Sequence, residues 1–309
     1  MFRKISKSTL LFFTLFYLTE FSFSQKNVSL TGKIDILTYD YFKEGKSVTK
    51  YSIKQSNLPL SQAIELKFKK EKPSIIRDQE IQVNCSKIEK NICHVEKFKV
   101  SSNEIKKTTS TGALKTLWVI VDVLDATAIL DIDKTKAKMD MTDNWFQKAS
   151  YGKLKVNKDV DDDGSYDVFR VKLTDYSKAN DGCNAGLLRS KTLAALTAQG
   201  VNINLYKRDV IIMPPLSCGW GGLGHVGCNN RCASWIHSVN WNLVYPHELG
   251  HNLTLRHAST DPENDGESNV EYGDGTCAMG NKLKLGHFNA PHTKRLGWLT
   301  SQDGQIVDI

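Results

Sequence analysis

Residues 246–257 read PHELGHNLTLRH and carry the strongest chemical signal in the chain. His247 and His251 are four residues apart, so on a helix they project from one face about one turn from each other. Two imidazoles in that arrangement can hold one Zn²⁺ ion at ~2.0–2.1 Å. Glu248 follows the first histidine, where its carboxylate can take a proton from a zinc-bound water. The stretch therefore predicts a zinc-binding helix that carries its own general base.

A third histidine, His257, follows His251 by six residues. That spacing is too far round to share the face of a straight helix, so His257 reaches the metal only if the helix stops and the chain turns back. Short HExxH strings also occur by chance in helices with incidental histidines, but a third histidine at this spacing makes coincidence a poor explanation. Three protein ligands leave a fourth position for water, which is the arrangement of a catalytic zinc site.

The three histidines and Glu248 resemble the metzincin clan of zinc endopeptidases, and the wording of the surrounding sequence resembles the gametolysin family. The resemblance covers roughly residues 115–300. It rests on the segments Ser150–Gly152, Cys218–Gly224, His247–Asn252, Glu271–Asp274 and Leu296–Leu299. It implies one catalytic Zn²⁺ with ligands His247, His251 and His257, the general base Glu248, and Met279 as the apolar floor beneath the metal.

The reaction implied by this resemblance is peptide hydrolysis, with extracellular-matrix or cell-wall proteins and glycoproteins as substrates. Zinc lowers the pKa of a water towards ~7, and Glu248 takes the proton and passes it to the leaving amine. The alternative is a catalytically silent secreted zinc-binding protein on the same fold, which would act by binding.

Three positions depart from the metzincin pattern. Thr254 stands where glycine ends the helix, and a β-branched residue at positive φ is strained by about 1–3 kcal/mol. Either the turn has another geometry or His257 is held less well. Pro246 is tolerated only in the first turn of a helix, so the helix starts late or is kinked. No tyrosine closely follows Met279, so we expect no tyrosine ligand.

The chain before and around the motif predicts a mixed α/β fold. Helices alternate with strands, which is typical of this class. The expected strands are 117–123, 168–173 and 209–213, and the expected helices are 134–149 and 185–198. We therefore expect an α/β catalytic domain over residues 111–309, with a mixed sheet and an active-site helix.

Residues 1–24 are typical of a secretory signal peptide. Arg3, Lys4 and Lys7 form a basic start, and a short apolar run over 10–18 is followed by small residues. A membrane anchor is the alternative, but the run is far short of the ~20 apolar residues that a spanning helix needs. We therefore expect a secreted, extracellular protein without a membrane span after signal removal.

Residues 25–110 predict a small β-rich propeptide domain, here called the N-terminal segment. Short runs of alternating apolar and polar residues favour strands. Residues 101–111 read SSNEIKKTTST, a polar composition that suits an exposed linker. Ahead of a protease domain such a segment is typical of a propeptide, so we expect a zymogen whose first partner is its own N-terminal segment.

The net charge of +7 belongs to the N-terminal segment. Residues 25–110 hold 17 basic and 10 acidic residues, whereas residues 111–309 hold 21 basic and 23 acidic residues. The lysines are scattered without an arginine cluster or interleaved aromatic residues, so we expect no nucleic-acid partner. The opposite signs suggest that charge helps to hold the propeptide against the protease.

The seven cysteines are an odd number, so at least one lies outside any intramolecular disulfide. Some metzincins are silenced by a propeptide cysteine on the zinc, and Cys93 is the candidate for such a switch here. The favoured alternative is a disulfide between Cys85 and Cys93, which leaves the free thiol in the protease domain and no cysteine switch.

Two further stretches carry weaker signals. The first spaces carboxylates like the start of a Ca²⁺ loop, although Arg170 stands where an EF-hand has its closing glutamate, so an acidic surface turn is the alternative. Its candidate calcium ligands are Asp159, Asp161, Asp163 and Asp167. The glycine-rich run 219–227 is expected to line the cleft, where an extended peptide could add as a strand.

Overall fold

A computed structural model describes residues 25–54, 63–69, 75–101, 110–263, 270–280 and 286–299. The predicted signal peptide and most of the predicted linker lie outside these residues. Within them, no helix is both long enough and apolar enough to span a membrane.

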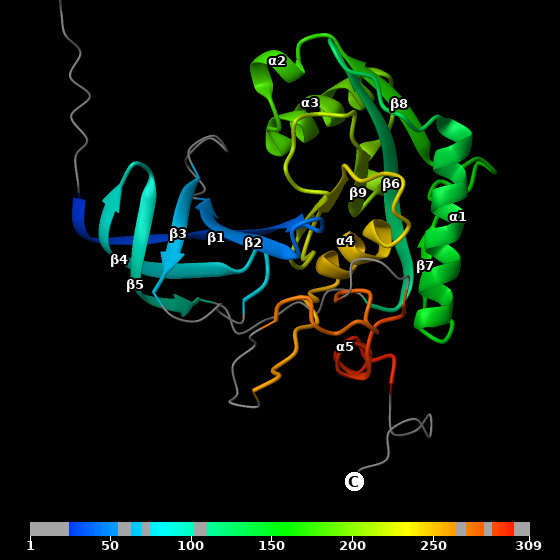
Figure 1. The fold of residues 1–309 in the computed structure, drawn as a ribbon. Helices are drawn as coiled ribbons and strands as arrows, with labels where there is room; N and C mark the ends of the chain where they lie inside the picture. Colours follow the sequence, from blue (N-terminus) through cyan, green and yellow to red (C-terminus); the bar gives the residue numbers. More distant parts are fainter. Residues whose placement is uncertain are drawn as a thin grey trace, which may run out of the picture.

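Eleven strands form one sheet that passes through both regions of the chain (Figure 1). The order is β2-β3-β5-β4-β1-β10-β11-β9-β6-β7, and β8 pairs with β6. The strands are β1 (Gln25–Tyr41), β2 (Lys46–Lys54), β3 (Ile64–Phe68), β4 (Glu80–Glu89), β5 (Ile92–Val100), β6 (Gly112–Val123), β7 (Leu154–Asn157), β8 (Val168–Leu173), β9 (Arg208–Ile212), β10 (Gly222–His225) and β11 (Cys232–Ile236).

The N-terminal segment is built from β1 to β5, drawn in blue and cyan in Figure 1. Alternate residues of these strands are buried, which gives the segment a core of its own around Ile34, Ile53 and Ile81. The expected fold class, with β-rich sequence ahead of a mixed α/β region, is confirmed, and the domain boundary stays a prediction.

In the rest of the chain, β6, β8, β9 and β11 run parallel and β10 runs antiparallel to β11. Helices cover both faces of this part of the sheet. They are α1 (Ile132–Ala149), α2 (Lys178–Asp181), α3 (Ala185–Ala198), α4 (Val244–Asn252) and α5 (Ala290–Arg295). Met139 and Phe146 of α1 share one core with Leu249 of α4, and Leu188 and Leu196 of α3 pack in the core on the other face.

Strand β1 joins the two regions. Its first half pairs antiparallel with β4, and residues Leu37 to Asp40 pair antiparallel with β10. The sheet is thus continuous across the predicted domain boundary, and the end of β1 reaches α4 (Figure 1). This pairing brings the N-terminal segment to the site that the histidine motif predicts.

Candidate active site

Helix α4 carries His247, Glu248 and His251, and all nine of its residues are buried. It begins at Val244, so Pro246 lies in the first turn, where the missing N–H of proline has no helical partner to lose. The helix therefore starts just ahead of the motif. His247 donates its backbone N–H to the Leu243 carbonyl at 3.1 Å, so the turn that presents the first histidine is intact.

The turn after α4 brings His257 back toward the helix. Thr254 has a φ of +77°, which is the left-handed conformation that favours glycine. The Thr254 N–H donates to the His251 carbonyl at 2.9 Å, and the Leu255 N–H donates to the Gly250 carbonyl at 3.0 Å. The turn thus has the left-handed geometry in spite of its threonine, and the backbone of Thr254 is strained.

Three imidazoles meet at one point. The ring centroids of His247, His251 and His257 lie 4.9 to 5.3 Å from one another. Each Nδ1 has an oxygen partner: the Ala278 carbonyl for His247 at 2.8 Å, the Leu255 carbonyl for His251 at 2.9 Å, and Glu271 Oε1 for His257 at 3.0 Å. A proton on each Nδ1 leaves the Nε2 lone pairs free for a metal.

The centre of this cluster is a set of buried polar atoms without hydrogen-bond partners among the described residues. They are the three histidine Nε2 atoms, both Glu248 carboxylate oxygens and Asp40 Oδ2. Buried polar atoms in native proteins are almost always satisfied, so this convergence requires a missing partner. Three neutral imidazoles beside carboxylates are a donor set that suits a divalent cation such as Zn²⁺, and the residues therefore fit a metal.

Met279 is fully buried and packs against α4 at Gly250. A Cβ on Gly250 would be only 2.6 Å from Met279 Sδ, so the glycine lets the methionine reach the helix. The carbonyl of the neighbouring Ala278 is the partner of His247. The segment that was expected to form the apolar floor therefore also orients the first histidine.

Glu248 points at strand β10. A Cβ on Gly222 would lie 1.9 Å from Glu248 Oε1, and one on Gly224 would lie 2.8 Å from Oε2, so only glycine leaves room for this carboxylate. Burial and the nearby Asp40 carboxylate raise the pKa of Glu248 well above its ordinary value. A carboxylate with a raised pKa is suited to accept and return a proton near neutral pH.

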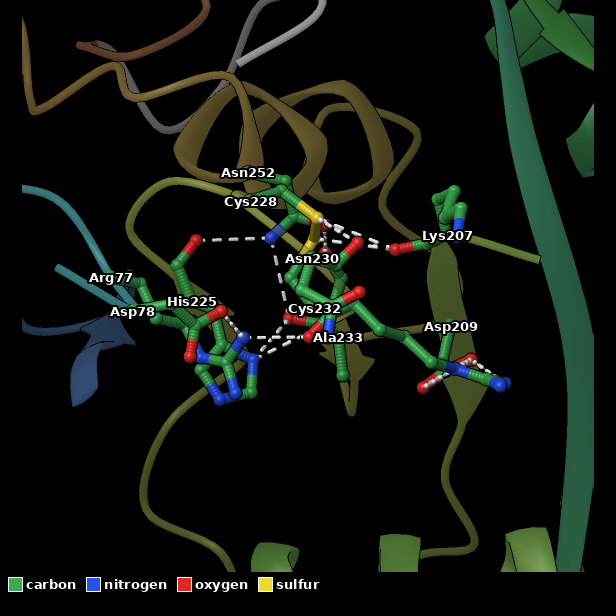
Figure 2. Close-up of a disulfide and its surroundings, with 12 residues drawn as sticks. Arg77, Asp78, Lys207, Asp209, His225, Cys228, Asn230, Cys232, Ala233 and Asn252 are labelled. Carbon is green, nitrogen blue, oxygen red and sulfur yellow. Dashed lines mark hydrogen bonds and ion pairs between the residues drawn. A yellow bond between two sulfur atoms is a disulfide. The ribbon is translucent and has the colours of Figure 1, made fainter. Parts of the chain in front are cut away.

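Strand β10 is anchored to α4 behind the site, as Figure 2 shows. Asn252, the last residue of α4, donates from Nδ2 to the carbonyls of His225 (3.0 Å) and Ala233 (3.3 Å). A disulfide between Cys228 and Cys232 closes the loop that joins β10 to β11. These contacts fix the distance between the helix that carries the histidines and the strand that faces Glu248.

The fourth member of the cluster, Asp40, was not foreseen. Its oxygens lie 3.7, 3.3 and 2.7 Å from the Nε2 atoms of His247, His251 and His257. Burial raises the pKa of Asp40, but electrostatic attraction to the neighbouring imidazoles of His257 and His247 outweighs burial and holds this pKa well below its ordinary value. Because Asp40 lies in β1, far from the motif in sequence, no spacing rule could find it.

Glu271 and Tyr272 also contribute, beyond the roles that the sequence suggested. Glu271 orients His257, and Tyr272 packs on the His257 ring with centroids 4.2 Å apart. The Tyr272 hydroxyl donates a hydrogen bond to Asp40 Oδ1. Both residues lie in the segment Glu271–Asp274, whose resemblance to gametolysins was the sequence feature that pointed to them.

The favoured disulfide between Cys85 and Cys93 is confirmed, and the Cys93 switch is wrong. Cys93 forms a disulfide with Cys85 inside the N-terminal segment, so it has no thiolate to offer a metal. A third disulfide joins Cys183 and Cys218, and Cys277 is a free, buried thiol in the protease region.

The acidic turn brings three of its four candidate ligands together. Carboxylate oxygens of Asp159, Asp161 and Asp167 lie within 4.8 Å of one another. Asp163 instead accepts the Ser165 N–H at 2.7 Å, and Asp167 accepts the Val160 N–H and the Tyr206 hydroxyl. Much of the acceptor capacity here is used by the turn itself, and Ca²⁺ binding stays a prediction.

Comparisons with known proteins identify several similar chains. Autolysin of Chlamydomonas reinhardtii is 35% identical over 101 residues, which are 30% of this chain and 15% of autolysin. Archaemetzincin from Methanopyrus kandleri aligns with 59% of this chain and 94% of its own, at 17% identity and a TM-score of 0.32. Metalloproteinase-II from Bacteroides fragilis aligns with 80% of this chain and 75% of its own, at 10% identity and a TM-score of 0.36.

A family model, the gametolysin peptidase M11 model, matches residues 127–308. This match covers more than half of the chain and includes the three histidines, Glu248 and Met279. The chain therefore belongs to the gametolysin family of metallopeptidases.

Proposed function

We propose that this protein is a secreted zinc endopeptidase of the metzincin type, made as a zymogen, that hydrolyses extracellular-matrix or cell-wall proteins. The observation that carries the proposal is the convergence of three buried histidine Nε2 atoms that have no hydrogen-bond partner among the described residues and lie 2.7 to 3.7 Å from the Asp40 oxygens. Secretion is supported by the three disulfides, which persist in oxidising compartments, and by the signal-like start of the chain.

His247, His251 and His257 would hold the metal. A bound Zn²⁺ supplies a Lewis acid that polarises the peptide carbonyl and acidifies water. Glu248 accepts the proton of the attacking water and delivers it to the leaving amine. The Nδ1 partners of the histidines keep the three rings in place while this proton moves.

Strand β10 is the proposed binding edge for the substrate backbone. Its glycines let it lie directly against Glu248, and the extended strand β1 now occupies the edge on which a peptide would add. A peptide that adds to this edge would gain main-chain hydrogen bonds and would lay its scissile bond beside the histidines. Backbone recognition of this kind suits an endopeptidase that acts within protein chains.

A direct test uses the secreted full-length chain and Glu248→Gln, with the exposed Glu263→Gln as the matched control. We expect about one zinc per chain in all three proteins. Once proteolysis has removed the N-terminal segment, including β1, the wild type and the control should cleave a generic protein substrate, and a chelator should stop them. Glu248→Gln should lose at least ~100-fold in rate while it keeps its zinc, because only the proton acceptor is gone.

The silent binding protein predicts a different result, namely bound zinc with no cleavage by any processed form. Thr254 favours this alternative, because a strained turn could hold His257 poorly. The turn at Thr254 nevertheless brings His257 to the other two histidines. Absence of zinc from the wild type would contradict both interpretations.

A further inference from the structure

The placement of Asp40 is unusual for a carboxylate. Its side chain is fully buried, and the ligand atoms of Asp40, His247, His251 and His257 all lie within 4.8 Å of one another. Burying an isolated carboxylate is costly unless a cation or several donors compensate for the lost hydration. Among the described residues, Oδ2 has no hydrogen-bond partner. The carboxylate therefore needs the same missing partner as the three imidazoles.

The backbone holds Asp40 at this point from both sides. In the β1–β10 ladder, Asp40 lies opposite Gly222, and the Gly221 N–H donates to the Asp40 carbonyl at 2.8 Å. On its other edge β1 pairs with β2, where Asp40 lies opposite Ser47. With both edges of the strand paired, a shift of register would displace the side chains of the whole ladder.

Neighbouring side chains close the space around the carboxylate. The Tyr272 hydroxyl donates to Asp40 Oδ1. Phe42, the first residue after β1, packs its ring edge-on to His247 with centroids 5.0 Å apart and to Trp241 with centroids 5.9 Å apart. Phe42 is buried in the same core as Leu249 of α4. A peptide substrate would need this space, and β1 fills it.

We propose that Asp40 is a fourth protein ligand of the zinc ion, so that the N-terminal segment closes the metal centre and keeps the enzyme latent. This inference rests on the proposed zinc peptidase function. Zinc sites with four protein ligands are closed, whereas catalytic sites keep one position for water. With Asp40 in place, the position that water and the peptide carbonyl need is taken, and β1 covers the edge on which a substrate would add.

A fourth protein ligand would slow the loss of zinc, so the role of Asp40 can be tested without an activity assay. The variant is Asp40→Asn in the full-length chain, which keeps the shape of the side chain and removes its charge. The matched control is Glu44→Gln, the same carboxylate-to-amide change at an exposed position just beyond β1. Zinc loss to a competing chelator should be at least ~10-fold faster in Asp40→Asn than in the control or the wild type.

Cobalt substitution gives a second readout that reports directly on the fourth position. Added azide should leave the visible spectrum of the wild-type and Glu44→Gln proteins unchanged, because no coordination position is open. It should alter the spectrum of Asp40→Asn. Asp40→Asn should also cleave protein substrate before any proteolytic processing, unlike the control.

A third variant guards against a folding defect in Asp40→Asn. Tyr272→Phe keeps the ring on His257 but removes the donor to Asp40, so its zinc loss should be several-fold faster than that of the wild type. Equal zinc-loss rates in all variants, or an azide response in the wild type, would overturn the role of Asp40 and leave the peptidase proposal standing. Failure of the wild type to bind zinc would instead defeat the peptidase proposal.

Discussion

Thr254 shows how a single strained residue can be kept by its neighbours. Its φ of +77° is unfavourable for a β-branched side chain, yet the two hydrogen bonds that end α4 hold it there. Thr254→Gly should therefore raise the free energy of unfolding by about 1 kcal/mol, after the greater freedom of glycine in the unfolded chain is subtracted. Chemical denaturation of the metal-free protein measures this. Activity should be kept, and a large loss of activity would mean that the threonine side chain has a separate role.

Glu271 shows how a residue outside the ligand set can determine metal affinity. It accepts the Nδ1–H of His257 at 3.0 Å and also the Ser47 hydroxyl of β2 at 2.6 Å. Glu271→Ala should weaken zinc binding roughly 10- to 100-fold, because His257 loses the partner that fixes its orientation. Competition with a chromophoric chelator provides the measurement. Glu271→Gln retains an acceptor oxygen and should restore most of the affinity; equal weakening in both variants would show that the charge itself matters.

Some residues of the site could be predicted from the sequence, and others could not. His247, His251 and Glu248 follow from helical spacing alone, and His257 follows once the helix is allowed to end. Asp40 could not be foreseen, because its place depends on the pairing of β1 with β10. Its hydrogen-bond partner Tyr272 is 232 residues away in sequence. A contact of that range is set by tertiary packing, which no local pattern records.

At the scale of the elements, the close approach of α4 to β10 depends on glycine. An alanine at Gly222 would push its Cβ into the Glu248 carboxylate. Gly222→Ala should therefore lower the turnover of the processed enzyme at least ~10-fold through displacement of the proton acceptor, with zinc still bound. Steady-state kinetics and zinc content measure this. Gly186→Ala in α3 is the control, because its Cβ meets nothing closer than 3.8 Å and helix propensity improves. An active Gly222→Ala enzyme would mean that Glu248 can move freely.

The strands and helices predicted from runs of buried apolar residues match the structure. The apolar run 117–123 is the buried end of β6, and the helix expected over 185–198 is α3. The run 219–227 was expected to line the cleft, and it contains β10. That the strand added to β10 is part of the same chain could not be deduced, because alternation in β1 shows which face is buried but not which edge it will meet.

At the scale of the whole molecule, the N-terminal segment and the protease region share one sheet, and their cores overlap at the end of β1. Among the described residues, the core around Ile34 and Ile81 takes only Val226 from the protease region, whereas Phe42 enters the core of α1 and α4. Tyr39 and Tyr41 pack against the core of α3. The segment is therefore a folded unit that is fastened by β1. Because Asp40 lies in β1, cutting the predicted linker would leave the β1–β10 pairing and the contacts of Asp40 intact. Release must separate β1 from β10.

The opposite charges of the two regions suggested that the N-terminal segment is held by charge, and the described contacts favour another mechanism. They include the main-chain ladder of β1 and β10, the buried Phe42, and hydrogen bonds such as Arg77 Nη1 to the Arg231 carbonyl at 2.6 Å. Buried contacts are hardly screened by salt, although the Debye length falls to about 3 Å at 1 M.

Retention of the cut segment is therefore expected to be nearly independent of salt and strongly dependent on Asp40. A protease site inserted between residues 102 and 109 would allow the linker to be cut, and gel filtration at low and at 1 M salt would measure co-elution. The wild-type segment should stay bound at both salt concentrations. The Asp40→Asn segment keeps the ladder but lacks the bond to the metal centre, so a larger fraction of it should dissociate at both concentrations. Release of the wild-type segment by salt alone would instead support the charge-held propeptide, and retention of the Asp40→Asn segment would show that the β1–β10 ladder suffices without the carboxylate.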